Sequence, residues 1–145
     1  MNILIINGPN INFLGVREPE VYGKMSYTDL TEYLYSYCSE KNIYSEIYQT
    51  NHEGEIIDII QNKYKAFDAL IINPGAYTHY SYAIYDCLLM INIKKIEVHL
   101  SNIYNREDFR KVSVTKNACH KQFYGKGFES YKEAIDYLLE EEEKW

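Results

Sequence analysis

The sequence predicts an α/β fold in which a five-stranded parallel sheet lies between two layers of helices. Two observations carry this prediction. Short apolar runs alternate with helical patterns along the 145 residues, and two of these runs are apolar on both faces, as strands covered by helices are. Alternating strands and helices require crossover connections, and therefore parallel strands. Five strands favour the flavodoxin-like order 2-1-3-4-5, which is a three-layer sandwich.

The five strands are expected in short stretches of distinct character. Residues 3–6 and 69–72 contain only isoleucine, leucine and alanine, so both stretches predict strands buried on both faces. Residues 44–49 are rich in residues that favour strands, and residues 96–100 form a fourth strand. Residues 119–124 alternate Cys, Lys and Phe with His, Gln and Tyr, a pattern typical of a half-exposed edge strand.

Helices are expected between these strands. Ser26 with Asp29 three residues later predicts a capping box, which opens a helix through about Glu40. Ser130 and Glu133 predict another capping box, which would open the last helix. Two further helical patterns lie between these boxes, at residues 55–64 and 81–90.

Composition limits the domain organisation and the classes of partner. Neither a Gly/Ser/Pro-rich linker nor an internal repeat divides residues 1–145, so we expect a single domain. The net charge of −6 argues against non-specific binding of nucleic acid, which depends on neutralising phosphates. No run approaches the ~20 apolar residues needed to cross a membrane. The first residues lack the basic segment of a secretory signal, so none is expected.

The cysteines and histidines predict neither disulfides nor a metal site. Cys38, Cys87 and Cys119 are odd in number and widely spaced, as free thiols of a reducing cytoplasm are. The histidines lie in different segments, without a ligand pair at helical spacing. The sequence has no G-x-x-x-x-G-K-[ST] motif, and no G-x-G-x-x-G motif follows the first strand, so neither of these phosphate-binding loops is present.

Polar side chains follow four consecutive predicted strands. In open parallel sheets, ligands bind outside the carboxyl ends of the strands. Asn, Gly and Pro at such positions also serve turns and helix caps, but the same bias at four strand ends favours a binding site. The side-chain types predict a neutral or anionic polar ligand. The segments are NGPN (residues 7–10), QTNHE (49–53), NPGAYTH (73–79) and EVHLSN (97–102), followed by Arg106 and Arg110.

The stretch NGPNINFLGVREPEVYG, residues 7–23, resembles the opening signature of type II 3-dehydroquinate dehydratases. That family normally has Leu where Ile11 and Phe13 stand. Three further segments agree in order and spacing: NHEGEIID (51–58), INPGAYTH (72–79) and EVHLSNIYNREDFR (97–110). The resemblance implies a flavodoxin-like fold and a dodecamer built as a tetramer of trimers. It also implies dehydration of 3-dehydroquinate to 3-dehydroshikimate, in the shikimate pathway, by anti elimination without metal or cofactor.

The resemblance assigns the proton-abstracting half of the reaction to the first loop. Tyr22 would be the general base that removes the proton alpha to the substrate ketone. A phenol titrates near 10, so the guanidinium of Arg17 would favour its ionised form. Asn10 would stabilise the resulting enolate through an ordered water. A loop of this length suits a lid over the site. Without the surrounding motif, Arg17 and Tyr22 would be interpreted as ordinary solvated loop residues.

The resemblance also assigns the acid and the substrate contacts. His99 would protonate the departing hydroxyl, and Glu97 would hold the imidazole in its acidic form. These two side chains, two residues apart on a strand, point to the same face. Asp86 resembles the acid that reaches a neighbouring subunit's site. The substrate contacts would be Asn73, His79 and Arg110 for the hydroxyls, with Ser101 and the backbone N–H groups of Leu100 and Ser101 for the carboxylate.

The sequence departs from the family pattern in two places. Tyr104 and Asn105 replace a more common His-Ala pair, and residues 119–122 are more polar than the usual fifth strand. The second departure leaves the packing of the edge strand and the assembly open. Two other functions also stay open: another lyase or hydrolase acting on a hydroxy-acid at the same edge, and a flavodoxin-like module that binds FMN or a partner protein without catalysis.

Overall fold

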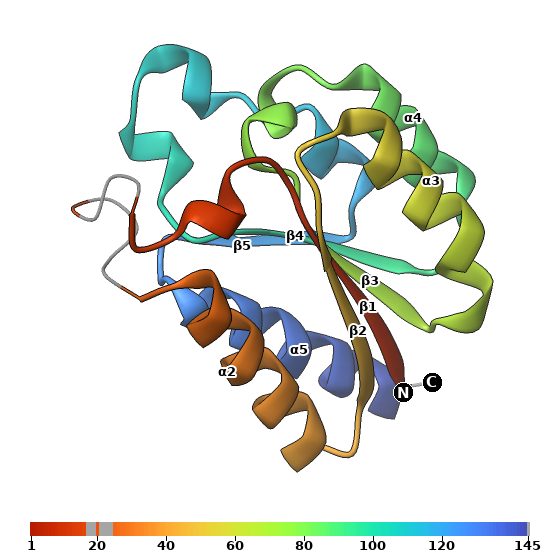
Figure 1. Cartoon of the computed structure of the whole chain (residues 1–145). Helices are drawn as coiled ribbons and strands as arrows, with labels where there is room; N and C mark the ends of the chain where they lie inside the picture. The colour runs from red at the N-terminus through yellow and green to blue at the C-terminus, as the bar shows by residue number, and fades with distance from the viewer. Residues whose placement is uncertain (17–19, 21–24, 145) are drawn as a thin grey trace.

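The structure of the protein is a computed structural model that describes residues 1–16, 20 and 25–144 (Figure 1). A five-stranded parallel sheet in the order β2-β1-β3-β4-β5 lies between two layers of helices, which confirms the predicted fold class and strand order. The strands are β1 (Asn2–Asn7), β2 (Tyr44–Gln49), β3 (Ala69–Asn73), β4 (Lys94–His99) and β5 (Lys121–Tyr124).

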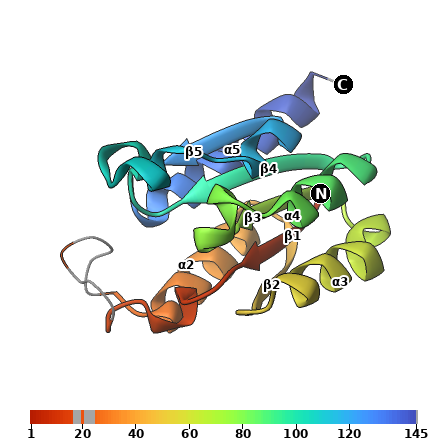
Figure 2. The same ribbon diagram turned by 90° about the horizontal axis from the view of Figure 1, so that it is seen from above.

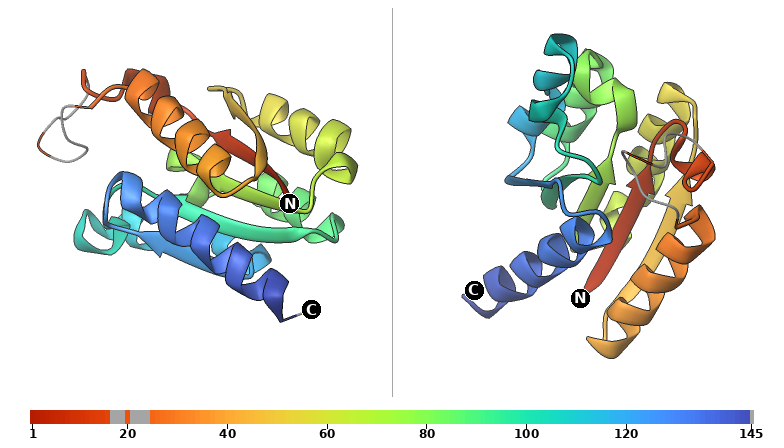
Figure 3. Two further views of the ribbon diagram at one scale, coloured as in Figure 1. Left: turned by 90° about the horizontal axis from the view of Figure 1, so that it is seen from below. Right: turned by 90° about the vertical axis from the view of Figure 1, so that its left-hand side faces the viewer.

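Two pairs of helices cover the two faces of the sheet. In the view from below in Figure 3, α2 (Tyr27–Glu40) and α5 (Phe128–Glu143) lie side by side on one face. The other face carries α3 (Glu53–Lys63) and α4 (Tyr82–Met90), as Figure 2 shows from above. No helix within the described part of the chain is long and apolar enough to cross a membrane. Short 3-10 turns complete the fold: η1 (Ile11–Phe13), η2 (Tyr64–Ala66), η3 (Gly75–His79), η4 (Ile103–Asn105), η5 (Asp108–Lys111) and η6 (Thr115–Ala118).

The central strands are apolar on both faces because each face meets a helical layer. Ile3 and Ile5 of β1 pack toward α2 and α5, while Leu4 and Ile6 pack toward α3 and α4. All four side chains are fully buried. Each such side chain contributes about 2 kcal/mol through burial. The sheet is thus held rigidly at its centre, and its carboxyl edge is left for polar residues.

The two predicted capping boxes had different outcomes. The Ser26 hydroxyl accepts from the Asp29 N–H at 3.1 Å, and the Asp29 carboxylate accepts from the Ser26 N–H at 2.8 Å, which confirms the first box. The second prediction was wrong, because α5 begins two residues before Ser130, with Gly127 as its N-cap. Ser130 instead accepts from the Lys126 N–H at 3.0 Å, and Glu133 pairs with the Lys126 ammonium at 2.6 Å.

The edge strand is shorter than predicted. β5 begins at Lys121 rather than at residue 119, because Cys119 closes the η6 turn through a bond from its N–H to the Lys116 carbonyl. His120 then joins β4 in two ways. Its N–H donates to the Lys95 carbonyl at 2.8 Å, and its Nδ1 accepts from the Lys95 N–H at 3.1 Å.

Candidate active site

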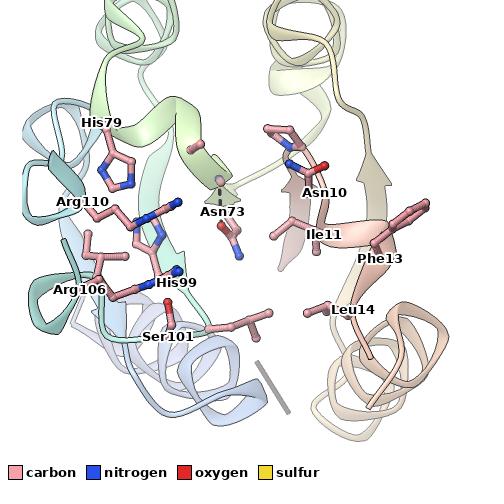
Figure 4. A pocket seen from close by; sticks show the side chains of 15 residues that line it. Asn10, Ile11, Phe13, Leu14, Asn73, His79, His99, Ser101, Arg106 and Arg110 are labelled. Atoms are coloured by element: carbon pink, nitrogen blue, oxygen red, sulfur yellow. Dashed lines mark hydrogen bonds between the residues drawn. The ribbon is translucent and has the colours of Figure 1, made fainter. Parts of the chain in front are cut away.

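A pocket lies at the carboxyl edge of the sheet, between the loops that follow β1, β3 and β4 (Figure 4). Figure 4 shows Asn10, Ile11, Phe13 and Leu14 along one wall, opposite the histidines and arginines. The structure therefore brings together residues that lie far apart in the sequence. Seven predicted site residues line this pocket: Asn10, Asn73, His79, His99, Leu100, Ser101 and Arg110.

Glu97 and His99 form a buried pair at the end of β4. The His99 Nε2 atom lies 2.8 Å from the Glu97 Oε2 atom, and the side chains are 5% and 0% exposed. Because a carboxylate only accepts, the Nε2–H of His99 donates this bond. The bond fixes the imidazole plane and leaves Nδ1 as the nitrogen not engaged by Glu97.

The Glu97 carboxylate accepts hydrogen bonds from five side chains: His99, Thr78 (3.0 Å), Ser113 (2.7 Å), Gln122 (2.6 Å) and Thr115. Burial alone would raise the pKa of this carboxyl. The bonds from His99, Thr115 and Ser113 outweigh burial, so the pKa lies below its usual value. Glu97 is therefore ionised near neutral pH, and its negative charge lies directly behind the imidazole of His99.

His79 presents a neutral imidazole to the pocket. Its Nδ1 lies 2.7 Å from the carbonyl oxygen of Val112, which can only accept, so Nδ1 carries the proton. Burial lowers the pKa of His79, and the neighbouring His99 and Arg110 lower it further. The Nε2 atom of the neutral ring can therefore accept a hydrogen bond from a ligand hydroxyl.

Asn73 is held at the base of the pocket by a buried polar chain. Its Nδ2–H donates to the Tyr131 hydroxyl at 3.0 Å, and that hydroxyl donates to the Asn7 Oδ1 at 2.5 Å. The Asn73 Oδ1 accepts from the Gly75 N–H at 3.1 Å. Tyr131 is fully buried within α5, and burial raises its pKa, so it stays a neutral phenol. The sequence patterns did not single out Tyr131, because an aromatic residue on the buried face of a helix is usually part of the core.

The loop after β1 is held against the loop after β3. The Gly8 N–H donates to the Asn73 carbonyl at 2.8 Å, and a Cβ at position 8 would lie 2.5 Å from the Pro74 carbonyl oxygen. Only glycine permits this approach. Asn10 follows in a left-handed conformation (φ 69°), and its N–H donates to the Asn51 Oδ1 at 3.0 Å. The residues after β2 thus support the pocket loop from behind rather than lining the pocket.

Two arginines give the pocket its positive charge. Arg110 Nε lies 2.8 Å from the Glu107 carboxylate, and Arg106 Nε lies 4.0 Å from the same group. Both arginine side chains line the pocket, opposite the wall that follows β1. Only Arg110 was assigned from the sequence. The charged loop was the signal for Arg106, but spacing alone did not distinguish it from a solvated residue.

Of the other four predicted site residues, Glu97 lies behind His99 rather than on the pocket wall. Asp86 is exposed on α4 and is not among the residues that line the pocket. Arg17 and Tyr22 lie outside the described residues. Within the described ranges, His, Cys, Asp and Glu side chains form no group of three that could hold a metal ion.

The fold and the pocket together define an α/β protein equipped for acid–base chemistry on a small polar ligand. A rigid parallel sheet places a buried carboxylate–imidazole pair at its carboxyl edge, where such folds bind ligands. Amide and imidazole groups beside it suit hydroxyls, and the arginines suit negative charge.

The sequence matches the family described as Dehydroquinase class II over residues 1–139. It is 52% identical over 138 residues to the 3-dehydroquinate dehydratase of Clostridium acetobutylicum, covering 95% of this chain and 96% of that one. It is 54% identical over 140 residues to that of Lachnoclostridium phytofermentans, covering 96% and 97%.

Solved structures agree with the sequence comparison. The type II dehydroquinase from Butyrivibrio crossotus superposes with a TM-score of 0.94 at 55% identity, covering 96% of this chain and 97% of that one. The type II dehydroquinase from Propionibacterium acnes gives a TM-score of 0.91 at 37% identity, covering 94% of each chain. The chain therefore belongs to the class II dehydroquinase family, which confirms the resemblance noted in the sequence.

Proposed function

We propose that the chain catalyses the dehydration of 3-dehydroquinate to 3-dehydroshikimate in the shikimate pathway, by anti elimination through an enolate. One observation carries the proposal: the buried Glu97–His99 pair lies at a pocket whose other polar groups suit a hydroxylated carboxylate. The reaction needs a base for the proton alpha to the ketone and an acid for the departing hydroxyl.

His99 is the acid. The charge of Glu97 stabilises the imidazolium form, which gives its proton to the leaving oxygen as the C–O bond breaks, so that water departs. Glu97 itself keeps its negative charge, because five hydrogen bonds already satisfy it. The pair then needs one proton from solvent to start another cycle.

Tyr22 is the base, as the family resemblance implies. Its phenolate takes the alpha proton, which leaves an enolate, and the guanidinium of Arg17 favours the phenolate before that step. Asn10 stabilises the enolate oxygen through a water molecule. One proton is removed and one is donated in each cycle, so the elimination of water is balanced.

The remaining pocket residues bind the substrate. His79, as a neutral imidazole, and Asn73 and Arg110 contact its hydroxyls. Ser101 and the backbone N–H groups of Leu100 and Ser101 hold its carboxylate. The position of Asn73 at the end of β3, and of Leu100 and Ser101 directly after β4, supports this division, because both strands direct their last residues into the same pocket that His79 and Arg110 line.

Assembly into a homo-oligomer, a dodecamer made as a tetramer of trimers, is part of the proposal. One face of α4 supports it: Tyr82, Leu89 and Met90 are all more than half exposed, and Asp86 lies among them at helical spacing. In this arrangement Asp86 reaches the site of a neighbouring subunit. Native mass spectrometry tests the assembly; a fully active monomer would contradict it.

Residues 1–145 would act as one domain in the cytoplasm, without cofactor. The cysteines support this location, since all three are free thiols. Burial raises the pKa values of Cys38 and Cys87, so both stay protonated and unreactive in the core.

An ultraviolet assay with 3-dehydroquinate, in the presence of a chelator, tests the reaction and its base. The product is a conjugated enone carboxylate, and its absorbance should rise with the wild-type protein. Tyr22→Phe should fold normally and show no turnover. Near-normal activity of Tyr22→Phe would exclude this base, and a folded but inactive wild-type protein would exclude the reaction.

A further inference from the structure

Tyr104 and Gln122, which belong to the two segments that depart from the family pattern, lie directly behind the Glu97–His99 pair. Gln122 is the β-ladder partner of Glu97, on the neighbouring strand β5. Its Nε2–H donates to the Glu97 Oε2 at 2.6 Å, the same oxygen that accepts from His99. Behind Gln122 lies Tyr104, whose hydroxyl donates to the Gln122 Oε1 at 2.5 Å.

The hydrogen bonds leave only one orientation for the Gln122 amide. Lys116 Nζ lies 3.3 Å from the Tyr104 hydroxyl oxygen. The Glu97 carboxylate can only accept, so the Gln122 Nε2–H must face it, and the Tyr104 hydroxyl, which can itself accept from Lys116, donates its proton to the amide oxygen. The amide oxygen of Gln122 therefore faces Tyr104, and its N–H faces Glu97. If the amide turned over, its oxygen would face the carboxylate and repel it.

We propose that Gln122 and Tyr104 are positioning residues, which act through Glu97 to hold His99 as the acid of the reaction. This inference rests on the proposed function. Tyr104 sets the orientation of the amide, the amide restrains Glu97 Oε2 and shares its charge, and Glu97 orients the imidazole. The chain of contacts runs from the surface of the sheet edge to the base of the pocket.

Other charged and titratable groups also face the Glu97–His99 pair, among the described residues. His79 and Arg110 face it from the pocket side. The Cys119 thiol also interacts electrostatically with Glu97 and with the Lys95 ammonium. None of these groups changes when Gln122 or Tyr104 is replaced by a neutral residue of similar shape. A change in the pH profile of such variants therefore reports the lost hydrogen bonds.

The test compares Gln122→Met and Tyr104→Phe with Tyr124→Phe as a matched control. Tyr124 lies on the same edge, with its ring 4.9 Å from that of Tyr104 and outside the chain of hydrogen bonds. We expect kcat to fall about tenfold in Gln122→Met and about threefold in Tyr104→Phe, with KM nearly unchanged. Tyr124→Phe should keep wild-type kcat.

Two further readouts separate positioning from a structural effect. Without the Gln122 N–H, Glu97 attracts the His99 proton more strongly, so the alkaline limb of the kcat profile should move to higher pH. The double variant of Gln122 and Tyr104 should be no slower than Gln122→Met alone, because Tyr104 acts through Gln122. Unchanged kcat, an unmoved limb, or additive effects in the double variant would each overturn the proposal. Tyr104→Phe keeps the test open if Gln122→Met fails to fold.

Failure of the proposed function is distinguishable from failure of this inference. If wild-type protein does not convert 3-dehydroquinate, the reaction is wrong, whatever the variants do. In that case an NMR titration of the His99 imidazole decides the inference. A titration of His99 that is shifted upward in Gln122→Met supports the positioning chain, and an identical titration overturns it.

Discussion

Glu97 and Glu46 are two strand glutamates that each accept several side-chain hydrogen bonds, but in different surroundings. Glu46, on the edge strand β2, accepts hydrogen bonds from Tyr44 at 3.0 Å, from Lys63 at 3.1 Å and from Tyr48. Its side chain is 27% exposed, whereas that of Glu97 is fully buried. Glu97 has five hydrogen-bond donors and Glu46 has three, but both carboxylates are well satisfied, and the decisive difference between them is burial.

Burial changes what the charge can do. At Glu46 solvent and salt screen the ion pair with Lys63, so the cluster contributes little to stability. At Glu97 the charge is out of water, and it persists only because neutral donors and His99 satisfy it. Its effect is thus concentrated on the one titratable partner that faces the pocket. The difference explains why the charge of Glu97 can act on His99, whereas the charge of Glu46 is only part of a solvated surface cluster.

The largest expected difference is in activity. Glu97→Gln keeps the shape but removes the charge behind His99, so kcat should fall about 100-fold or more. Glu46→Gln should change kcat by less than about twofold, because Glu46 lies outside the pocket. Steady-state assays with 3-dehydroquinate measure both. Equal losses in the two variants would mean that the comparison reports general damage to the sheet.

The loss of protein stability at acid pH also distinguishes Glu97 from Glu46. The pKa values of both carboxyls are lowered. The hydrogen bonds from Tyr48 and Lys63 lower the pKa of Glu46. At Glu97 burial raises the pKa, but the hydrogen bonds that the carboxylate accepts outweigh burial and lower it. For a group with a lowered pKa, the unfolded chain binds more protons. Stability is therefore present above the unfolded value of 4.5 and is lost as pH falls through the folded value.

Denaturant unfolding at a series of pH values measures this loss. Between about pH 5 and about pH 3 the free energy of unfolding should fall less steeply in Glu97→Gln than in the wild type. Glu46→Gln should keep most of the wild-type slope, because solvent screens its charge. A wild-type slope in Glu97→Gln would show that Glu97 is not the acid-sensitive group.

The smallest expected effects come from single donors. Ser113→Ala removes one of the hydroxyls that hold Glu97, which should cost about 1 kcal/mol of stability and lower kcat several-fold. Tyr44→Phe removes one hydrogen-bond donor to Glu46, and it should change neither the stability nor kcat measurably. Thermal unfolding and the same assay check this pair. An effect of Tyr44→Phe as large as that of Ser113→Ala would contradict the role given to burial.

The fold was predictable wherever apolar patterning decides it. The runs at 3–6 and 69–72 are strands because both faces of the sheet are covered. The first capping box forms because Ser26 and Asp29, three residues apart, bond to each other's backbone N–H. The second box failed because Lys126 takes both Ser130 and Glu133 as partners. That contact depends on how the chain arrives from β5, which local sequence does not encode.

The site was predictable at the strand ends and not behind them. Residues such as His99 and Asn73 stand at the carboxyl ends of strands, where topology directs them into one pocket. Ser113 comes from the connection between η5 and η6, and Thr115 opens the short η6 turn, where single hydroxyls are usually turn residues. Gln122 was noted only as an unusually polar edge residue, because its partner on β4 emerges from strand pairing.

The proposed reaction assigns proton removal to Tyr22 and proton donation to His99. Hydrogen exchange in the variant His99→Asn tests this assignment most directly. With the base intact and the acid removed, 3-dehydroquinate incubated in D2O should exchange its alpha proton while very little product forms. Proton NMR of the recovered substrate follows both processes at once. Exchange without elimination is the predicted result. Elimination at the wild-type rate, or loss of exchange and elimination together in a folded variant, would contradict the assignment of His99 as the acid.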